Sequence, residues 1–395
     1  MASENGATSN SGVTDSMHQF AFFVIGMTSW LVAAPQGEGR LLDLTSSPYA
    51  ATADGTGDSR SALSRAFRDA QPGDTIYFPP GDYRVVLPGG ALTIPAGVTL
   101  LGHGGESTIL LESNASGTDY REFLRPSDNV TLEGLTIERA GSFTGVLLPF
   151  GGSASHVVVR DCRIVGHQSA HRGACHCFRV GFGTVRDFTL DQVTIEECAY
   201  GLFQSNDATG TIEEVTVTNC RFHRNTASDL EFNAPKGKMR RIVVRDCFFS
   251  DNQSKGASSG FAVGFANVRD GRVENCVIAN YGSEALHVED RSENIQLVGN
   301  KIVGGSRRQN NGVILVVNDS RHVTIADNFV DGRPNTNKPH LILVTAGGDK
   351  FPKPTKVTVT GNVLVNGPAT RTWYLQPGST APREANIVVK WEPSK

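Results

Sequence analysis

The sequence predicts an all-β protein, a parallel β-helix of about ten coils with an N-terminal capping helix. Three observations support this prediction: a recurring strand pattern, a high glycine content and a low content of charged residues. Gly makes up 43 of the 395 residues, about 11% against the usual ~7%. Charged residues make up only 19%. This composition favours a turn-rich β protein over a helical bundle.

The recurring pattern is an alternating strand followed by a small or polar residue, which we call the ladder residue. It occurs nine times, with a mean spacing of about 28 residues. A unit of this length, with short strands separated by turns, is typical of a parallel β-helix. The ladder residues are Gly134, Cys162, Val193, Cys220, Cys247, Cys276, Asn300, Asn328 and Asn362.

Equivalent positions in stacked coils line up because strands of successive coils pair at about 4.8 Å. Small Cys side chains and Asn amides that bond to one another suit an inward turn of such a stack. This interpretation assigns four of the seven Cys residues to core packing rather than to disulfides or metal sites.

The remaining Cys-rich stretch, residues 167–177, combines His residues with a Cys-x-Cys pair. Cys175 and Cys177 share one strand face while His176 points the other way, which is a poor match to a transition-metal site. We expect instead a loop on one outer face of the β-helix, with His171 and Arg172 reaching from it toward any substrate bound on that face.

A capping helix is expected just before the coils, because Asp58 or Ser59 can serve as an N-cap. A helix here would close the open end of the stack, where a sheet edge and the apolar interior are otherwise exposed. Its apolar face would consist of Ala62, Leu63, Ala66, Phe67 and Ala70.

The domain prediction is one elongated domain with flanking segments, although length alone suggests two or three domains. Residues 1–19 are expected to be disordered, 51–365 to form the β-helix and 366–395 to form a C-terminal cap. Residues 20–50 are signal-like or form a cap, and the sequence leaves these two alternatives open. We expect a secreted or cell-envelope protein.

The opening of the β-helix resembles a known group of proteins. Residues 54–58 read Asp-Gly-Thr-Gly-Asp, 79–83 read Pro-Pro-Gly-Asp-Tyr and 97–102 read Gly-Val-Thr-Leu-Leu-Gly. These motifs resemble the start of pectate-lyase-like proteins, and with the repeats the resemblance covers about residues 50–365. It implies a right-handed single-stranded β-helix and a polysaccharide or oligosaccharide partner. No specific subfamily is matched, so the reaction has to be inferred from the site.

The resemblance implies a glycan groove along one outer sheet, and the strand after each ladder residue is expected to line this groove. Period-2 alternation gives one inward and one outward column of side chains. The inward column is Phe178, Leu202, Leu230, Phe261 and Leu286, and the outward column is Arg179, Phe203, Glu231, Ala262 and His287. Flanking positions hold Asp207, Asp229, Asn233, Glu289 and Asp290.

This column predicts acid/base chemistry centred on Glu231. Glu231 and Glu289 lie two coils apart, about 9.6 Å, close to the ~6.5–9.5 Å separation of inverting glycosidases. Asp229 is expected on the same face, where it would raise the pKa of Glu231 to suit a general acid. His287 would orient the carboxylates.

Two groups with a binding role are also expected in this column. Phe203 offers a stacking platform for a sugar ring. Arg179 offers donors for hydroxyl groups or for a uronate carboxylate.

The first functional hypothesis is therefore a glycoside hydrolase that needs no cofactor. The second is a calcium-assisted polysaccharide lyase, with Asp229, Glu231 and Asn233 as calcium ligands and Lys236 or Lys238 as base. A third is a non-catalytic glycan-binding or tailspike-like structural protein. The net charge of −3 provides no general electrostatic reason to expect nucleic acid or a membrane as partner.

Overall fold

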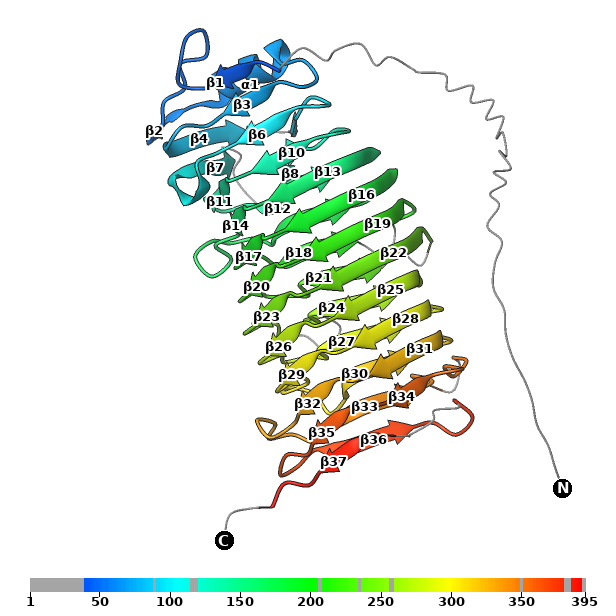
Figure 1. The fold of residues 1–395 in the computed structure, drawn as a ribbon. Coiled ribbons are helices and arrows are strands. Elements are labelled where there is room, and N and C mark those ends of the chain that lie inside the picture. The colour runs from blue at the N-terminus through cyan, green and yellow to red at the C-terminus, as the bar shows by residue number, and fades with distance from the viewer. Residues whose placement is uncertain are drawn as a thin grey trace, which may run out of the picture. The chain divides into compact units, whose positions relative to one another are not determined.

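The computed structural model describes residues 39–87, 90–113, 120–204, 208–233, 236–255, 259–348, 351–379 and 385–392. In this part of the chain, successive coils stack on one another and each contributes strands to three parallel sheets (Figure 1). The predicted all-β parallel β-helix is confirmed. The segment predicted at 1–19 lies outside the described residues, and so does the part of the 20–50 segment up to residue 38.

The three sheets contain 12, 13 and 10 strands. The first sheet comprises β1 (Leu41–Asp43), β3 (Thr75–Tyr77), β6 (Thr99–Leu101), β10 (Thr131–Glu133), β13 (Ala154–Arg160), β16 (Thr184–Asp191), β19 (Thr211–Thr218), β22 (Lys238–Arg245), β25 (Val268–Glu274), β28 (Glu293–Val298), β31 (Arg321–Ala326) and β34 (Thr358–Thr360). The second sheet comprises β2 (Asp54–Asp58), β4 (Gly81–Leu87), β7 (Ser107–Ser113), β11 (Thr136–Ala140), β14 (Arg163–Val165), β17 (Thr194–Glu196), β20 (Arg221–His223), β23 (Phe248–Ser250), β26 (Val277–Ala279), β29 (Lys301–Val303), β32 (Phe329–Asp331), β35 (Val363–Val365) and β37 (Ile387–Val389).

The third sheet carries the residues expected to form the site. It comprises β8 (Tyr120–Glu122), β12 (Thr144–Phe150), β15 (Cys175–Val180), β18 (Tyr200–Gln204), β21 (Leu230–Asn233), β24 (Val263–Ala266), β27 (Leu286–Glu289), β30 (Gly312–Val317), β33 (His340–Thr345) and β36 (Arg371–Leu375). A short pair, β5 (Leu92–Thr93) with β9 (Leu124–Arg125), and the 3-10 turn η1 (Gly104–Glu106) complete the early coils.

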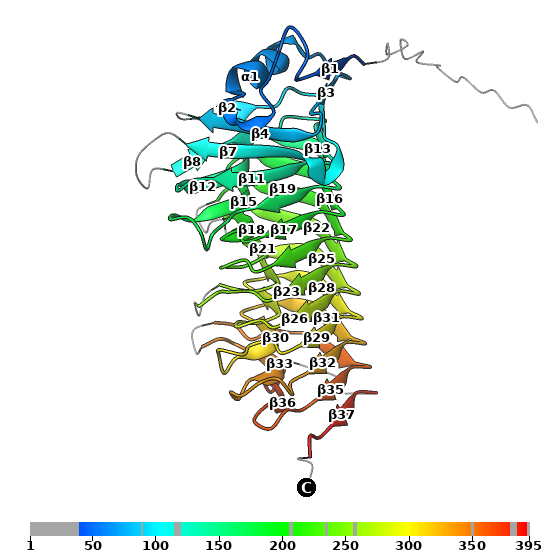
Figure 2. The ribbon, with the colours of Figure 1, turned by 90° about the vertical axis from the view of Figure 1, so that its left-hand side faces the viewer.

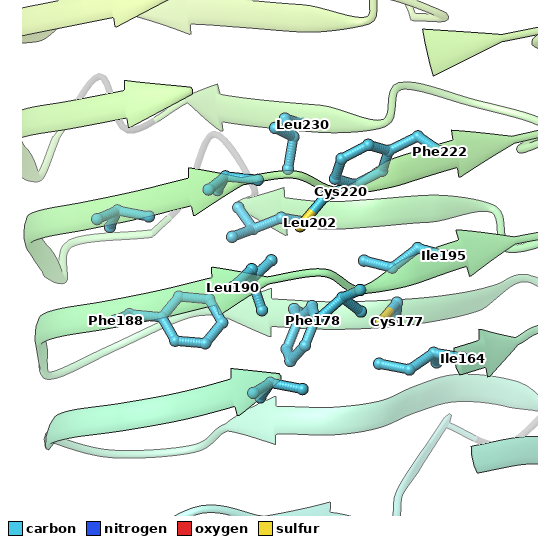
Figure 3. Close-up of a cluster of buried hydrophobic side chains, with 14 of the residues drawn as sticks. Ile164, Cys177, Phe178, Phe188, Leu190, Ile195, Leu202, Cys220, Phe222 and Leu230 are labelled. Carbon is cyan, nitrogen blue, oxygen red and sulfur yellow. The ribbon is translucent and has the colours of Figure 1, made fainter. Parts of the chain in front are cut away.

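The core is a continuous column of apolar side chains that all three sheets point inward (Figure 3). Equivalent residues stack along the axis: Ile164 pairs with Ile195, and Ile195 with Phe222. Phe222 in turn stacks on Phe249, with ring centroids 4.7 Å apart and rings 6° from parallel. One coil cannot bury its own apolar face, so the stack of coils creates the core.

The turn before each ladder residue requires a left-handed backbone conformation. Asp161, Asn219 and Gly299 have φ values of 51°, 56° and 68°. Gly and, less readily, Asn and Asp tolerate this region. The glycine-rich and Asn/Asp-rich turn composition therefore reflects a bend that recurs once in each coil.

The predicted ladder is buried and lies where the strand pattern placed it, with one exception. Glu133 pairs with Arg160, so Leu135 and not Gly134 aligns with Cys162. Gly134 occupies the left-handed position of that coil instead, with φ 62°. The seven cysteines are all free and buried.

The Asn part of the ladder forms a chain of amide hydrogen bonds along the axis. Asn300 Nδ2 donates to Asn328 Oδ1 at 3.0 Å, and Asn328 Nδ2 donates to Asn362 Oδ1 at 2.9 Å. Asn362 Nδ2 donates in turn to Asn386 Oδ1, so the chain extends to Asn386, a residue outside the predicted ladder. Each amide also bonds the backbone of its neighbours, for example Asn328 Nδ2 to the Leu297 carbonyl.

The helix α1 (Arg60–Asp69) lies at the N-terminal end of the stack, beside β1 to β4 (Figure 2). Its buried face is formed by Ala62, Leu63, Ala66 and Phe67, four of the five predicted residues; the fifth, Ala70, is buried as the C-cap just after the helix. Asp58 Oδ1 accepts the Arg60 backbone N–H at its start. The stacked sheets extend beyond the predicted range 51–365 at both ends: β1 lies before this range, and β36 and β37 lie after it. No helix within the described ranges is long and apolar enough to cross a membrane.

We expect Asn328→Ala to lower the free energy of unfolding by at least about 2 kcal/mol. The substitution leaves the buried Asn300 N–H and the Leu297 carbonyl without their partners, and each lost partner costs about 1–3 kcal/mol. Urea unfolding followed by circular dichroism measures the change. The exposed Asn310, which accepts one backbone N–H, provides the control: an equal loss in Asn310→Ala would contradict a special role for the ladder.

Candidate active site

A pocket of about 390 Å³ opens on the outer face of the third sheet, across β18, β21, β24 and β27. Six of the residues predicted from the sequence line it, and they come from three separate coils. They are Phe203, Glu231, Asn233, His287, Glu289 and Asp290. The remaining lining residues are Tyr200, Phe232, Phe261, Gly264, Phe265 and Ala266.

Strand register brings these residues together. Phe203 pairs with Glu231, Glu231 with Gly264, and Gly264 with His287. A second outward column runs beside it from Asn233 through Ala266 to Glu289. The backbones of Glu231 and His287 are therefore two strand spacings apart, about 9.6 Å.

The middle strand of the pocket, β24, differs from the sequence prediction by two residues. Val263, not Phe261, is the inward residue, and Gly264, not Ala262, is the outward one. A slip of two residues preserves the alternation of inward and outward positions, so the pattern alone cannot detect it. Ala262 is fully buried.

Phe261 lies in the pocket rather than in the core column. Its ring contacts the His287 imidazole, with centroids 4.5 Å apart. A Cβ atom on Gly264 would come within 2.9 Å of the Phe261 ring. Glycine is therefore required at position 264 for this ring to lie over the strand.

Glu231 is a largely buried carboxyl group on the pocket wall, 9% exposed. Burial raises its pKa, and the negative charge of Glu289 adds to this shift against opposing effects of Ser228 and His287. Its Oε2 atom is buried and has no hydrogen-bond partner among the described residues. Glu231 therefore holds its proton more tightly than an ordinary glutamate.

His287 lies between two carboxylates. Its Nε2 is 3.3 Å from Glu289 Oε2 and its Nδ1 is 3.9 Å from Glu284 Oε2. Burial lowers the pKa of His287, but the two glutamates outweigh burial and raise it to about 10. Conversely, burial raises the pKa of Glu289 and Glu284, yet the imidazolium brings both below their usual range.

The pocket thus contains two carboxyl groups with pKa values shifted in opposite directions, upward for Glu231 and downward for Glu289. Such a pair provides a proton donor and a charged base at the same pH. Glu284, which the sequence prediction missed, is 1% exposed and lies behind His287. Its position three residues before His287 was the only sequence signal for it.

Asp229 does not share the face of Glu231, contrary to the prediction. It lies in a bend directly before β21, where strand alternation does not apply. Its carboxylate is buried, accepts Asn225 Nδ2 at 2.6 Å and accepts the Tyr281 hydroxyl. Burial raises the pKa of Asp229 to about 7.

This placement bears on the proposed calcium ligands. Because Asp229 points into the interior while Glu231 and Asn233 line the pocket, the three do not form a common ligand set. No group of three or more His, Cys, Asp or Glu side chains in the described part of the chain is arranged to hold a metal ion.

An aromatic wall closes the pocket beyond Glu231. The centroids of the Tyr200 and Phe203 rings are 4.4 Å apart, and the His176 ring stacks on both with centroid distances of 5.2 Å. Burial lowers the pKa of His176 to about 4, so it is neutral and acts as a third ring in this wall. His176 points outward while Cys175 and Cys177 are buried, as the alternation predicts.

The other predicted binding residues lie elsewhere. Arg179 lies over the Tyr120 ring, 4.9 Å from its centroid, outside the pocket. Lys238 begins β22 in the first sheet, and neither it nor Lys236 lines the pocket.

The loop that precedes β15 also contributes nothing to the pocket. His171 accepts the Gly141 N–H and the Arg172 carbonyl accepts Arg139, which attaches this loop to the preceding coil. Asp207 lies outside the described residues.

Comparison with known proteins identifies the fold. The family model described as "Right handed beta helix region" matches residues 179–364. The fold is a right-handed parallel β-helix. No curated protein matched the sequence.

Several solved β-helices resemble the chain. The A-module of an Azotobacter vinelandii mannuronan C-5 epimerase has a TM-score of 0.54 at 16% identity, covering 89% of this chain and all of that one. The Streptococcus pneumoniae surface adhesin PfbA scores 0.60 at 12% identity, covering 88% and 91%. A tailspike of E. coli bacteriophage HK620, solved with a pentasaccharide, scores 0.57 at 12% identity, covering 88% and 66%. At these identities the comparison concerns the fold.

We expect the His287 imidazole to remain doubly protonated at pH 8. Its pKa of about 10 places the loss of the proton well above neutral pH. Nitrogen-15 NMR of the histidine side chains measures the titration. In Glu284→Gln, which removes one flanking negative charge, the midpoint should move to lower pH. A neutral imidazole at pH 7 in the unmodified protein would contradict this arrangement.

Proposed function

We propose that the protein is a carbohydrate-active enzyme that binds a glycan in the pocket and hydrolyses a glycosidic bond. The observation that carries this proposal is the opposite pKa shift of Glu231 and Glu289 within one pocket. In glycosidases, one protonated and one charged carboxyl group flank the bond to be cleaved.

In this mechanism Glu231 is the general acid and Glu289 the general base. Glu231 gives its proton to the glycosidic oxygen as the bond between that oxygen and the anomeric carbon breaks. Glu289 accepts a proton from a water molecule whose oxygen bonds to the anomeric carbon. The two-coil separation leaves room for that water, so we expect inversion at the anomeric carbon. His287 keeps Glu289 charged and in place.

Other pocket residues are assigned to substrate binding. The aromatic wall of Tyr200 and Phe203 offers an apolar surface to the face of a sugar ring. Asn233 and Asp290 also line the pocket and provide polar groups for hydroxyls. The mannuronan epimerase and the tailspike with its pentasaccharide are in keeping with a glycan ligand. The surface adhesin is in keeping with a secreted or cell-envelope location.

We expect Glu231→Gln to reduce turnover about 10²–10⁴-fold while the protein stays folded, because the proton donor is lost. The assay is a panel of polysaccharides, with release of reducing ends as the measure of cleavage. The exposed Glu106 provides the matched control, and Glu106→Gln should retain full activity.

Three outcomes of this assay would overturn the proposal. Full activity in Glu231→Gln would remove this residue from the chemistry. Products with the ultraviolet absorbance of an unsaturated uronate would indicate β-elimination instead of hydrolysis. Tight glycan binding without turnover by the unmodified protein would indicate a binding protein. One structurally similar protein is named as a surface adhesin.

We also expect a bell-shaped dependence of kcat/KM on pH. The acidic limb follows protonation of Glu289, whose pKa is lowered, so activity should persist below the usual glutamate range. The basic limb follows ionisation of Glu231, whose pKa is raised, so activity should fall as pH rises through that value. A pH–rate profile that lacks the basic limb would contradict the role of Glu231 as acid.

A further inference from the structure

A second, smaller hollow lies on the same sheet, on the N-terminal side of the pocket. Its volume is about 120 Å³, and its lining residues come from β8, β9, β12, β15 and the positions just after β12 and β15. It is lined by Glu122, Arg125, Phe150, Gly151, Arg179, Gly181 and Phe182. Arg179 stands in the same outward column as the catalytic pocket, since it pairs with Phe203 and Phe203 pairs with Glu231.

Two guanidinium groups line this hollow. Arg125 donates from Nη2 to Glu122 at 2.6 Å, but its buried Nε has no hydrogen-bond partner within the described chain. Arg179 contacts the Tyr120 ring, and its buried Nε likewise has no partner there. Each unused N–H in a buried position costs free energy unless a ligand accepts it.

The backbone is shaped around one of these groups. A Cβ atom on Gly151 would come within 2.6–2.8 Å of the Arg125 guanidinium. Any other residue at position 151 would therefore push Arg125 out of the hollow. Gly181 and the exposed Phe182 ring also line the hollow.

The two cavities have opposite charge. Two arginines and one glutamate give the smaller hollow a formal charge of +1. The catalytic pocket contains Glu289, Asp290 and protonated His287, with Glu284 behind them, and is negative overall. An anionic sugar is therefore repelled from the catalytic pocket and attracted to the hollow, where the guanidinium fork matches a carboxylate or a sulfate.

We propose that the Arg125/Arg179 hollow is a subsite for the acidic group of one sugar in the glycan that is cleaved at Glu231. The substrate is then an acidic heteroglycan, with an uncharged sugar in the catalytic pocket and a carboxylated or sulfated sugar in the hollow. Arg179 and Glu231 are two strand spacings apart, about 9.6 Å, comparable to the length of one disaccharide. The placement of a glycan across both cavities rests on the proposed function. The anion site itself does not.

The test is direct binding of small probes, measured by saturation-transfer NMR on Glu231→Gln so that no turnover is needed. The probes are sodium glucuronate, glucose 6-sulfate and uncharged glucose. We expect at least one of the two anionic sugars to bind about tenfold or more tightly than glucose, and added salt to weaken it. Preference for glucuronate or for the sulfate identifies the acidic group.

Variants locate the binding. Arg125→Gln and Arg179→Gln should each weaken binding of the anionic probe about tenfold. Arg179→Lys should retain only part of the binding affinity, because lysine lacks the planar fork of the guanidinium. Arg245→Gln, which removes an exposed arginine of the first sheet, should leave binding unchanged.

Equal binding of all three probes, or unchanged binding in both arginine variants, would overturn the subsite. Intact probe binding together with no hydrolysis of any glycan would overturn the proposed function and leave the subsite standing. The two proposals are therefore tested separately.

Discussion

In-register pairing of parallel strands between successive coils is the constraint on which the rest of the structure depends. It fixes which side chains point inward, so the apolar column, the Asn chain and the outward columns follow from one register. It also gathers residues that are far apart in sequence, because each coil moves the chain by only about 4.8 Å along the axis. Phe203 and Asp290 thus border the same pocket.

A buried polar contact connects the coils that carry the acid and the base. Asp229 lies two residues before Glu231, and Tyr281 lies in the coil of His287 and Glu289. The Tyr281 hydroxyl donates to Asp229 across the intervening coil, and Asn225 occupies the other carboxylate oxygen. Such a contact inside the stack restrains the relative position of the two catalytic strands, in addition to the backbone pairing that they share with β24.

The sequence was sufficient for the fold and for most of the pocket, because both depend on a repeat and on period-2 alternation. Its errors have specific physical causes. Asp229 lies in a bend before β21 rather than in the strand. The predicted register of β24 was wrong by two residues, an error that alternation cannot detect. Tyr200 was missed because it stands three residues before Phe203, a spacing that period-2 alternation does not predict for one face. Glu284 was missed because it lies before the start of β27. The pKa shifts of Glu231 and His287 depend on burial and on charges from other coils, which no sequence pattern reports.

The intervening strand β24, with Gly264 between Glu231 and His287, has a consequence for stereochemistry. In a β-helix the separation along the axis between two groups on one sheet face changes only in whole steps of about 4.8 Å. Glu231 and Glu289 stand in neighbouring columns, and their separation along the axis is two steps. Carboxylates on adjacent coils would match the ~5–5.5 Å of retaining glycosidases, whereas one coil between them approaches the range of inverting enzymes. Deletion or duplication of a single coil would therefore switch such a site between the two outcomes without altering any catalytic residue.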